Sequence, residues 1–352
     1  MKKRVTIYDI AEKSGFSVGT VNRALSGKSR ISPETKKLIL ATAEKLGYKA
    51  NLAAQSLRRA PITLGAVLSC PVEEYVDSII DGINFAAADL EKYNVTIDIQ
   101  KIEFTDGADC ANKTYNIVNK FADKNYNGII LFMSSSDDEM KELSALIDDL
   151  AQKNIFVATV ANDIPSSKRI IHVAPDAFMA GQLAAQLLEF SCAGEDVALL
   201  VSRSNVHVST QYVNGFTEYA KDGLFSSVKI YEHYDNESKV INVTDQMLIE
   251  NPDLKGVYMT TAASHIACNH IKNTKKGGLK IISTDLLSET PEFLAKKIAT
   301  ATIFQNPFRQ GKIVTERLYQ YITTRECDGV HLIAPHILLS SNVAPYLNND
   351  IL

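Results

Sequence analysis

The sequence has no long apolar run. Its 352 residues are 45% hydrophobic and 22% charged, an ordinary balance for a globular protein in water. No apolar stretch approaches the roughly 18 residues that a membrane span needs. The first residues, MKKRVTIYDIAEKS, are basic, but no continuous apolar core follows them. We therefore expect a cytoplasmic protein with no signal peptide and no contact with a membrane.

Cysteine pairs and enzyme motifs are also missing. The five cysteines are scattered and no two form a C-x-x-C pair, which favours reduced thiols over disulfides or a zinc site. The chain has no G-x-S-x-G elbow, no H-E-x-x-H pair and no glycine-rich nucleotide fingerprint. Gly27-Lys28-Ser29 imitates the end of a phosphate loop, but the glycine required five residues earlier is Asn22. We expect neither an enzyme nor a bound metal or cofactor.

Acidic residues are scarce at one end of the chain. Residues 1–60 contain 13 Lys and Arg but only 4 Asp and Glu, a formal charge of +9, whereas the whole chain carries −4. The remaining residues therefore carry −13. A small basic head on an acidic body predicts that the head alone binds a polyanion. The plainer interpretation, a solvated charged face, would not require this segregation.

Residues 6–23, TIYDIAEKSGFSVGTVNR, predict two short helices joined by a tight turn. Thr6 and Asp9 form a Thr-x-x-Asp capping pair at the first helix. Gly15 can reverse the chain, because glycine enters positive φ without a Cβ penalty. Ser17 can cap a second helix, whose apolar residues fall at helical spacing: Val18, Val21 and Leu25. This is the pattern of a helix-turn-helix, whose second helix normally enters the DNA major groove.

A third helix is predicted to begin at Ser32 and Pro33, a capping residue followed by a proline at the first helical position. Residues 1–49 should therefore form an all-α, three-helix DNA-binding head. Residues 50–60 are short and basic, and Asn51 is able to cap one or two helical turns. Such a helix is too short to be stable alone, so we expect a hinge helix or linker that folds on DNA.

Residues 61–352 alternate apolar strand-like runs with helical patterns, which is typical of an α/β fold with helices on both faces of parallel sheets. Ten strands are too many for one small doubly wound unit, so we expect two doubly wound parallel sheets in a two-lobe core. We place the division near residues 163–168. The lobes of this effector-binding and dimerisation core are then an N-lobe of 61–162 and 306–325, and a C-lobe of 163–305 and 326–345.

Polar residues follow many of the predicted strands. In open α/β sheets ligands bind beyond the carboxyl ends of the strands, so these residues are candidates for a binding site. Hydroxyls, amides and carboxylates dominate, which suits a neutral polyhydroxylated ligand, and Tyr75 could supply a stacking face. Asp, Asn and Ser also cap the helices that follow strands, so a purely structural role stays open for each.

With head, linker and body assembled, the chain resembles the lactose-repressor (LacI/GalR) family of bacterial transcription regulators over essentially its full length. The resemblance is most specific in VTIYDIAEKSGFSVGTVNRALSG, ISPETKKLILATAEKLGYKAN and LAAQSLRR, between residues 5 and 59. The body resembles ribose-type periplasmic-binding-protein type I modules. It does so through four segments: DGINFAAADL (81–90), PDAFMAG (175–181), STDLLSETP (283–291) and FQNPFRQG (304–311).

The resemblance implies roles in DNA binding. Arg23 is the residue best able to read guanine with two hydrogen bonds, whereas Val18 and Gly19 could at most contact a thymine methyl. Leu57 matches the hinge leucine that wedges into the minor groove and kinks the operator, with Ala54 beside it. The full set expected to contact DNA is Thr6, Ser17, Val18, Gly19, Thr20, Asn22, Arg23, Ser32, Asn51, Ala54 and Leu57.

The resemblance also implies an effector site. Asp163, Asp285 and Gln305 match positions at which relatives hold sugar hydroxyls. The chain departs from the family at Tyr212, where relatives often carry Arg, and this argues against a carboxylate-bearing or purine ligand. It also has Ala262-Ala263 where many relatives have Asn-Asp. The full set expected to contact the effector is Glu74, Tyr75, Ser134, Asp163, Asn205, Tyr212, Thr261, Asp285 and Gln305.

We therefore predict a sequence-specific DNA-binding repressor whose affinity for its operator is controlled by a small sugar-like effector bound between two lobes. It should act as a homodimer or higher oligomer on near-palindromic double-stranded operator DNA. The alternative is a corepressor-dependent repressor or an activator of the same family that responds to a non-sugar small molecule.

Overall fold

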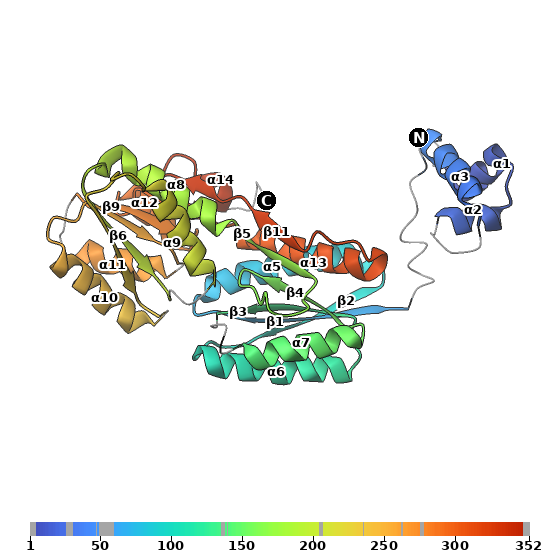
Figure 1. Ribbon diagram of the computed structural model, residues 1–352, viewed down its shortest axis with the longest axis horizontal. Helices are drawn as coiled ribbons and strands as arrows, with labels where there is room; N and C mark the ends of the chain where they lie inside the picture. The colour runs from blue at the N-terminus through green and yellow to red at the C-terminus, as the bar shows by residue number, and fades with distance from the viewer. Residues whose placement is uncertain are drawn as a thin grey trace. The chain divides into compact units, whose positions relative to one another are not determined.

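The computed structural model describes residues 5–25, 31–46, 48, 60–134, 138, 140–203, 207–234, 236–261, 263–274 and 278–347. The chain separates into two compact units, Met1–Ala60 and Pro61–Leu352 (Figure 1). Residues 49–59 lie outside the described residues. The predicted hinge helix, with Asn51, Ala54 and Leu57, therefore stays a prediction.

The head consists of three helices: α1 (Ile7–Ser14), α2 (Val18–Leu25) and α3 (Pro33–Lys45). The predicted capping box is present, with the Thr6 N–H donating to the Asp9 carboxylate at 2.6 Å and the Asp9 N–H donating to Thr6 Oγ1 at 3.4 Å. Gly15 ends α1 at φ +74°. The Thr35 N–H donates to Ser32 Oγ at 3.2 Å, which caps α3. Local capping therefore sets the ends of these helices.

A small apolar core holds the head together. Its buried residues come from all three helices: Ile10, Val21, Ala24, Ile39 and Ala43. Leu25, one of the predicted core residues of α2, packs against this cluster but is only half-buried. Because each helix is at most 13 residues long, tertiary packing of these side chains is needed to keep the helices folded.

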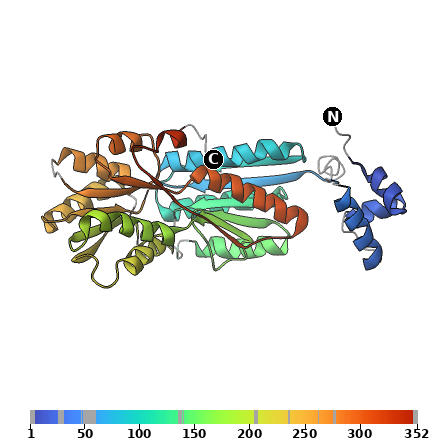
Figure 2. The same cartoon turned by 90° about the horizontal axis from the view of Figure 1, so that it is seen from above.

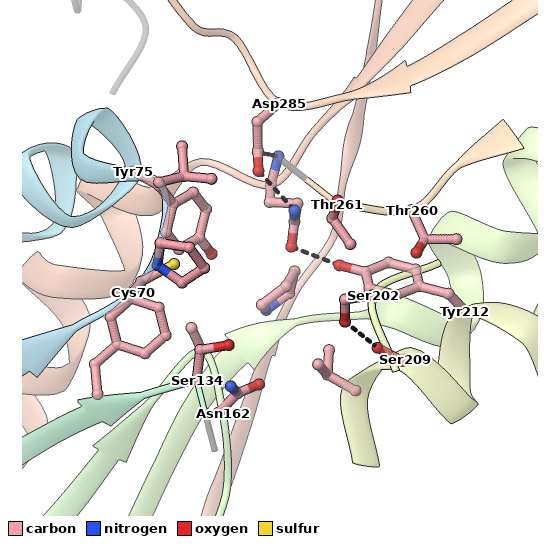
Figure 3. A pocket seen from close by; sticks show the side chains of 17 residues that line it. Cys70, Tyr75, Ser134, Asn162, Ser202, Ser209, Tyr212, Thr260, Thr261 and Asp285 are labelled. Carbon is pink, nitrogen blue, oxygen red and sulfur yellow. Dashed lines mark hydrogen bonds between the residues drawn. The ribbon is translucent and has the colours of Figure 1, made fainter. Parts of the chain in front are cut away.

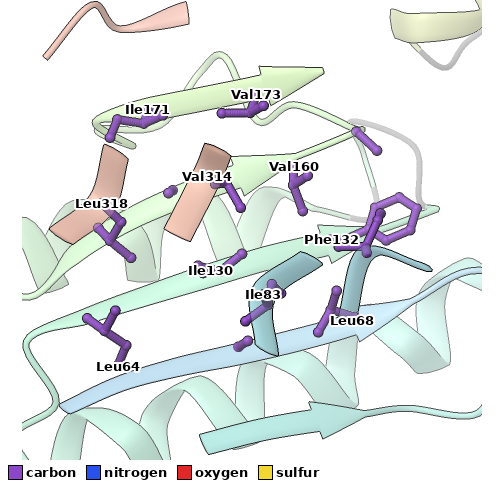
Figure 4. Close-up of a cluster of buried hydrophobic side chains, with 14 of the residues drawn as sticks. Leu64, Leu68, Ile83, Ile130, Phe132, Val160, Ile171, Val173, Val314 and Leu318 are labelled. Carbon is purple, nitrogen blue, oxygen red and sulfur yellow. The ribbon is translucent and has the colours of Figure 1, made fainter. Parts of the chain in front are cut away.

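The first sheet of the body is wholly parallel, with strand order β11-β5-β4-β3-β1-β2. Helices α5 (Glu73–Glu91) and α13 (Pro307–Thr324) cover one face, and α6 (Gly107–Asp123) and α7 (Lys141–Gln152) cover the other (Figure 1). Figure 4 shows the apolar cluster between the sheet and α5 with α13. The strands are β1 (Ile62–Ser69), β2 (Val95–Lys101), β3 (Gly128–Met133), β4 (Phe156–Val160), β5 (Ile171–Pro175) and β11 (Val330–Ile333).

The second sheet has the order β12-β10-β9-β8-β6-β7, and only β12 is antiparallel to its neighbour. Helices α8 (Ala177–Cys192) and α9 (His207–Tyr219) cover one face, and the other carries α10 (Glu237–Glu250), α11 (Ser264–Asn273) and α12 (Thr290–Ala295). Figure 2 shows the two lobes from above. The strands are β6 (Asp196–Val201), β7 (Ser227–Glu232), β8 (Gly256–Met259), β9 (Lys280–Thr284), β10 (Ala301–Phe304) and β12 (His336–Leu338); α14 (Ala344–Leu347) follows.

Two of the three predicted lobe boundaries, at 162–163 and 325–326, are wrong, whereas the chain does change lobe between β10 and α13, near the predicted 305–306. Between residues 60 and 347 as described, the chain passes from one lobe to the other after β5, after β10 and after β11. The strand β5 pairs with β4 and β11, so the N-lobe continues to Pro175 and the polar stretch 163–168 is a loop within that lobe. Residues 326–333 also belong to the N-lobe. The sequence analysis did not propose β11 and β12, which have four and three residues and lie at sheet edges.

Each lobe contains the same close pair of helices, α5 with α13 and α8 with α9. A Cβ on Gly82 would lie 1.9 Å from the carbonyl oxygen of Phe308. A Cβ on Gly215 would lie 1.9 Å from the carbonyl oxygen of Phe178. No side chain fits at either point, because backbone atoms cannot move aside as a flexible side chain can. Both lobes are therefore built as rigid bodies around a glycine contact.

Gly82→Ala tests this contact. We expect a loss of about 3 kcal/mol of stability, because the added methyl group must push two packed helices apart. Asn84→Ala, on the exposed side of the same helix, is the control and should change stability little. Thermal and urea unfolding of the full chain measure both variants. An unchanged melting temperature for Gly82→Ala would contradict the packing described.

Candidate functional site

The predicted DNA-contacting residues of α2 lie on its solvent face: Ser17, Gly19, Asn22 and Arg23 are exposed, and Val18 and Thr20 are half-buried. Ser17 Oγ accepts a hydrogen bond from the Thr20 N–H at 3.2 Å, which caps the helix. Arg23 Nε donates to the Gly19 carbonyl at 3.2 Å, so the guanidinium lies along the first turn of α2. The helix therefore presents a polar, cationic edge to solvent.

Thr6 and Ser32 stand at the beginnings of α1 and α3 and are exposed. The N–H groups in the first turn of a helix attract anions such as phosphate. Contacts of these two residues with the DNA backbone stay a prediction. So do the contacts of Asn51, Ala54 and Leu57, which lie outside the described residues.

A cleft between the two lobes of the body holds about 630 Å³ of space, including the part that is open to solvent. Both lobes contribute to its walls, with Tyr75 and Tyr212 on opposite sides (Figure 3). The lining residues are Cys70, Pro71, Val72, Tyr75, Phe132, Ser134, Ala161, Asn162, Pro175, Ser202, Val208, Ser209, Tyr212, Thr260, Thr261, Asp285 and Gln305. The cleft lies at the carboxyl ends of the strands, as expected for parallel α/β sheets.

Gln305 organises one wall of the cleft. Its Nε2 donates to Asp285 Oδ2 at 2.7 Å, and its backbone N–H donates to Asp285 Oδ1 at 3.1 Å. Its Oε1 accepts a hydrogen bond from the Tyr212 hydroxyl at 2.5 Å. These bonds orient the carboxylate, amide and phenol together (Figure 3). Burial raises the pKa of Asp285 from 3.8 to about 7, and the two bonds from Gln305 oppose the shift.

The same wall connects to the N-lobe. The Gln310 Nε2, on α13, donates to the Gln305 carbonyl at 3.0 Å and lies 3.1 Å from the Tyr75 hydroxyl. Burial raises the pKa of Tyr75 and Tyr212 well above the ordinary value, so both phenols stay protonated. A continuous set of hydrogen bonds therefore runs from α5, through the crossing at residues 304–307, to α9.

Apart from Thr260, the other polar side chains that line the cleft have partners within the protein. Asn162 Nδ2 donates to the Met133 carbonyl at 2.7 Å. The hydroxyls of Ser202 and Ser209 lie 3.1 Å apart, and the Thr261 hydroxyl lies 3.3 Å from His233 Nε2. None of the described residues that line the cleft is Lys or Arg. Such a wall suits a neutral ligand with hydroxyl groups, because it contains no cation for an anionic group to pair with.

Six of the predicted effector residues line the cleft: Tyr75, Ser134, Tyr212, Thr261, Asp285 and Gln305. Asn205 lies outside the described residues. Sequence reasoning did not select several other lining residues, among them Phe132, Asn162, Ser202, Ser209 and Thr260. Phe132 could not have been found by a search for polar strand ends, because it lies within β3. Asn162, Ser202 and Thr260 follow strands directly and carry the same signal as the residues that were chosen.

Asp163 does not line the cleft, which corrects its prediction as an effector contact. Its carboxylate receives two hydrogen bonds of 2.6 Å from Arg169, and it also accepts from Thr159 at 3.0 Å. Burial would raise the pKa of Asp163, but Arg169 and nearby His172 outweigh this effect and lower it. The loop after β4 thus uses this carboxylate to hold itself together.

Glu74 is the second correction, since it lies outside the cleft lining and joins the lobes directly. Its Oε2 accepts the Ser288 N–H and its Oε1 accepts the Ser288 hydroxyl, each at 2.8 Å. Glu74 is on α5 of the N-lobe, and Ser288 follows β9 of the C-lobe. We call this pair the clasp. The clasp joins the two lobes without lining the cleft.

Two kinds of feature are absent from the described part of the chain. No group of three or more His, Cys, Asp and Glu side chains there is placed to hold a metal ion. No helix there combines the length and the apolar character needed to cross a membrane.

Comparison with known proteins assigns both units. Residues 6–51 match the family described as bacterial regulatory proteins, lacI family, and residues 65–326 match the periplasmic binding protein domain. Catabolite control protein A of Priestia megaterium is 29% identical over 168 residues, 46% of this chain and 46% of that protein. The chain thus spans about half the length of this relative.

Two other matches cover more of the molecule. HTH-type transcriptional regulator pepR1 of Lactobacillus delbrueckii subsp. lactis is 21% identical over 343 residues, 96% of this chain and 97% of the relative. The crystal structure of GanP, a glucose-galactose binding protein from Geobacillus stearothermophilus, has a TM-score of 0.69 at 21% identity. It covers 81% of this chain and 99% of its own. This second likeness establishes the fold of the body.

Asp285→Asn tests the buried carboxyl. A folded-state pKa raised from 3.8 to about 7 gives stability at low pH that is lost as the pH rises through about 7. The melting temperature of the natural protein minus that of Asp285→Asn should therefore fall by about 5 °C between pH 5 and pH 8. The exposed Asp81→Asn is the control. A difference that does not vary with pH would show that Asp285 is already ionised at pH 5.

Proposed function

The chain belongs over residues 65–326 to the periplasmic binding protein domain family, and on this premise we propose that it is a sugar-controlled repressor of the lacI family, whose pattern its residues 6–51 match. A neutral, sugar-like effector binds between the lobes and changes the affinity of the head for its operator. The single observation that carries this proposal is the polar, cation-free cleft around Asp285 and Gln305. GanP, which shares the fold of the body, is a glucose-galactose binding protein, and this supports a sugar over other neutral molecules.

The proposed control uses the two links between the lobes. A ligand held by Asp285, Gln305 and Tyr75 touches groups that already bridge the lobes, so its binding favours one lobe arrangement. The clasp between Glu74 and Ser288 favours closure in the same way. Because coupling is reciprocal, the factor by which the effector changes operator affinity equals the factor by which operator changes effector affinity.

The head is proposed to work in pairs. One α2 helix reads few base pairs, and family heads gain selectivity when two copies bind half-sites related by two-fold symmetry. We therefore propose a homodimer on a near-palindromic operator, in the cytoplasm where the chromosome lies. The basic residues of the head support attraction to phosphate, and Thr20 and Arg23 support base contacts.

A thermal-shift screen tests the proposed effector. Neutral pentoses, hexoses and polyols are added to the full chain, with the corresponding sugar phosphates as a charged comparison. A neutral sugar should raise the melting temperature by mass action, about 2.7 kcal/mol of stabilisation at 100 times Kd. The matching phosphate should not, because no lining residue is a cation. Stabilisation by the phosphates alone would refute a neutral effector.

Arg23→Ala tests the proposed readout by α2. Discrimination between operator and random DNA should fall about 10- to 100-fold, because a two-pronged contact with guanine is lost. Lys13→Ala, in the last turn of α1, is the matched control because it removes one exposed positive charge from the same head. It should weaken binding to both DNAs equally. Fluorescence anisotropy at fixed salt measures both, and undiminished selectivity of Arg23→Ala would rule out the contact.

Glu74→Gln tests the clasp. The amide can keep both contacts with Ser288, because its Oε1 accepts the N–H and its Nε2 donates to the hydroxyl oxygen, but both bonds lose the charged acceptor that strengthens them. We expect effector affinity to fall about fivefold, equivalent to ~1 kcal/mol. Glu73→Gln is the control, since its carboxylate faces Lys101 at 3.6 Å within the N-lobe. Calorimetry with the sugar found in the screen measures both variants. If Glu74→Gln bound the sugar with the same affinity as Glu73→Gln, the clasp would have no part in effector binding.

A further inference from the structure

One hydroxyl in the cleft has no hydrogen-bond partner among the described residues. Thr260 follows β8, its side chain lines the cleft, and only 1% of the residue is exposed. Its backbone N–H donates to the Leu200 carbonyl at 3.0 Å. Its Oγ1 is buried and makes no hydrogen bond. A buried hydroxyl without a partner costs free energy, which the isosteric apolar side chain of valine would avoid.

The neighbours of Thr260 show how unusual this is. The adjacent Thr261 hydroxyl has His233 within 3.3 Å, and the hydroxyls of Ser202 and Ser209 face each other at 3.1 Å. The Tyr212 hydroxyl is bound to Gln305. These hydroxyls can still donate or accept a further hydrogen bond with a ligand, but they do not need a ligand in order to be hydrogen-bonded. Thr260 is the lining hydroxyl whose hydrogen bond must come from whatever enters the cleft.

We propose that Thr260 is a specificity-determining residue, which exchanges a hydrogen bond with one hydroxyl of the neutral effector and so rejects analogues that lack it. The inference rests on the proposed function of the cleft. Its basis is that a site with a buried polar group discriminates strongly against ligands that leave this group unpaired, whereas apolar contact discriminates weakly. The Thr260 hydroxyl can serve as donor or acceptor, so a sugar hydroxyl of either orientation can satisfy it.

The chain supplies matched controls. Thr114, on α6, is fully buried and its Oγ1 also has no hydrogen-bond partner, but it does not line the cleft. Thr244, on α10, is fully buried too, and its Oγ1 donates to the Val240 carbonyl at 2.7 Å. Replacing each threonine by valine separates three effects: loss of an unpaired hydroxyl in the cleft, the same loss elsewhere, and loss of a satisfied hydroxyl.

The experiment has two parts, both on the full chain. Without ligand, T260V and T114V should melt at or above the temperature of the natural protein, and T244V below it. Calorimetry then measures binding of D-ribose, D-glucose and D-galactose to the natural protein. The sugar that binds best becomes the parent sugar and is compared with its monodeoxy analogues. T260V should bind the parent sugar about 10- to 100-fold more weakly, and T114V should bind it as the natural protein does. The natural protein should bind one monodeoxy analogue more weakly than the parent sugar, whereas T260V should bind that analogue and the parent sugar with equal affinity.

Each outcome decides a different point. A lower melting temperature for T260V would mean that the hydroxyl is satisfied within the protein, which overturns the inference. Unchanged affinity of T260V for the parent sugar, or undiminished discrimination between parent and analogues, would overturn it as well. If the natural protein binds none of the three sugars, the proposed sugar effector fails first. The role of Thr260 then fails with it. That result is seen in the natural protein itself, whereas failure of the Thr260 inference alone is seen only in T260V.

Discussion

The body depends on the hydrogen bonds of one side chain, Gln305. Its amide holds the Asp285 carboxylate and the Tyr212 phenol, and its backbone carbonyl receives Gln310 from the other lobe. Gln305 lies on a segment that passes between the lobes, and it is almost fully buried. Every change in the angle between the lobes must therefore alter distances in this set. A ligand that binds these groups necessarily acts on the lobes, because ligand contacts and interlobe contacts share the same atoms.

The rigidity of each lobe makes this arrangement effective. The backbone contacts at Gly82 and Gly215 lock α5 to α13 and α8 to α9, so neither pair can absorb strain by sliding. Packed helices and close-packed cores deform little, and motion is confined to the segments that join them. The connecting segments after β5, β10 and β11 are short. A small displacement of the groups that line the cleft should therefore rotate one whole lobe against the other.

The sequence predicted most of the fold because its determinants are local. Capping at Thr6 and Ser32, glycine at Gly15 and the apolar runs of the sheets each act over a few residues. The lobe division was missed because β5 belongs to the first sheet through its pairing with β4 and β11, and strand pairing is not visible in the sequence pattern. Asp163 was misassigned for a similar reason. Its position after a strand fits a ligand contact, and only the fold shows Arg169 beside it.

Charge separates the two proposed binding functions of the molecule. Residues 1–60, the head and linker, carry a formal charge of +9, and the described residues that line the cleft include no Lys or Arg. DNA and other polyanions are therefore attracted to the head and gain nothing in the cleft, whereas a neutral sugar gains little from a cationic surface. The buried, partly neutralised Asp285 strengthens this separation, since a full negative charge there would favour cationic ligands. In the proposed regulator each ligand is thus recognised by its own chemistry, and the two ligands influence each other through the conformation of the protein.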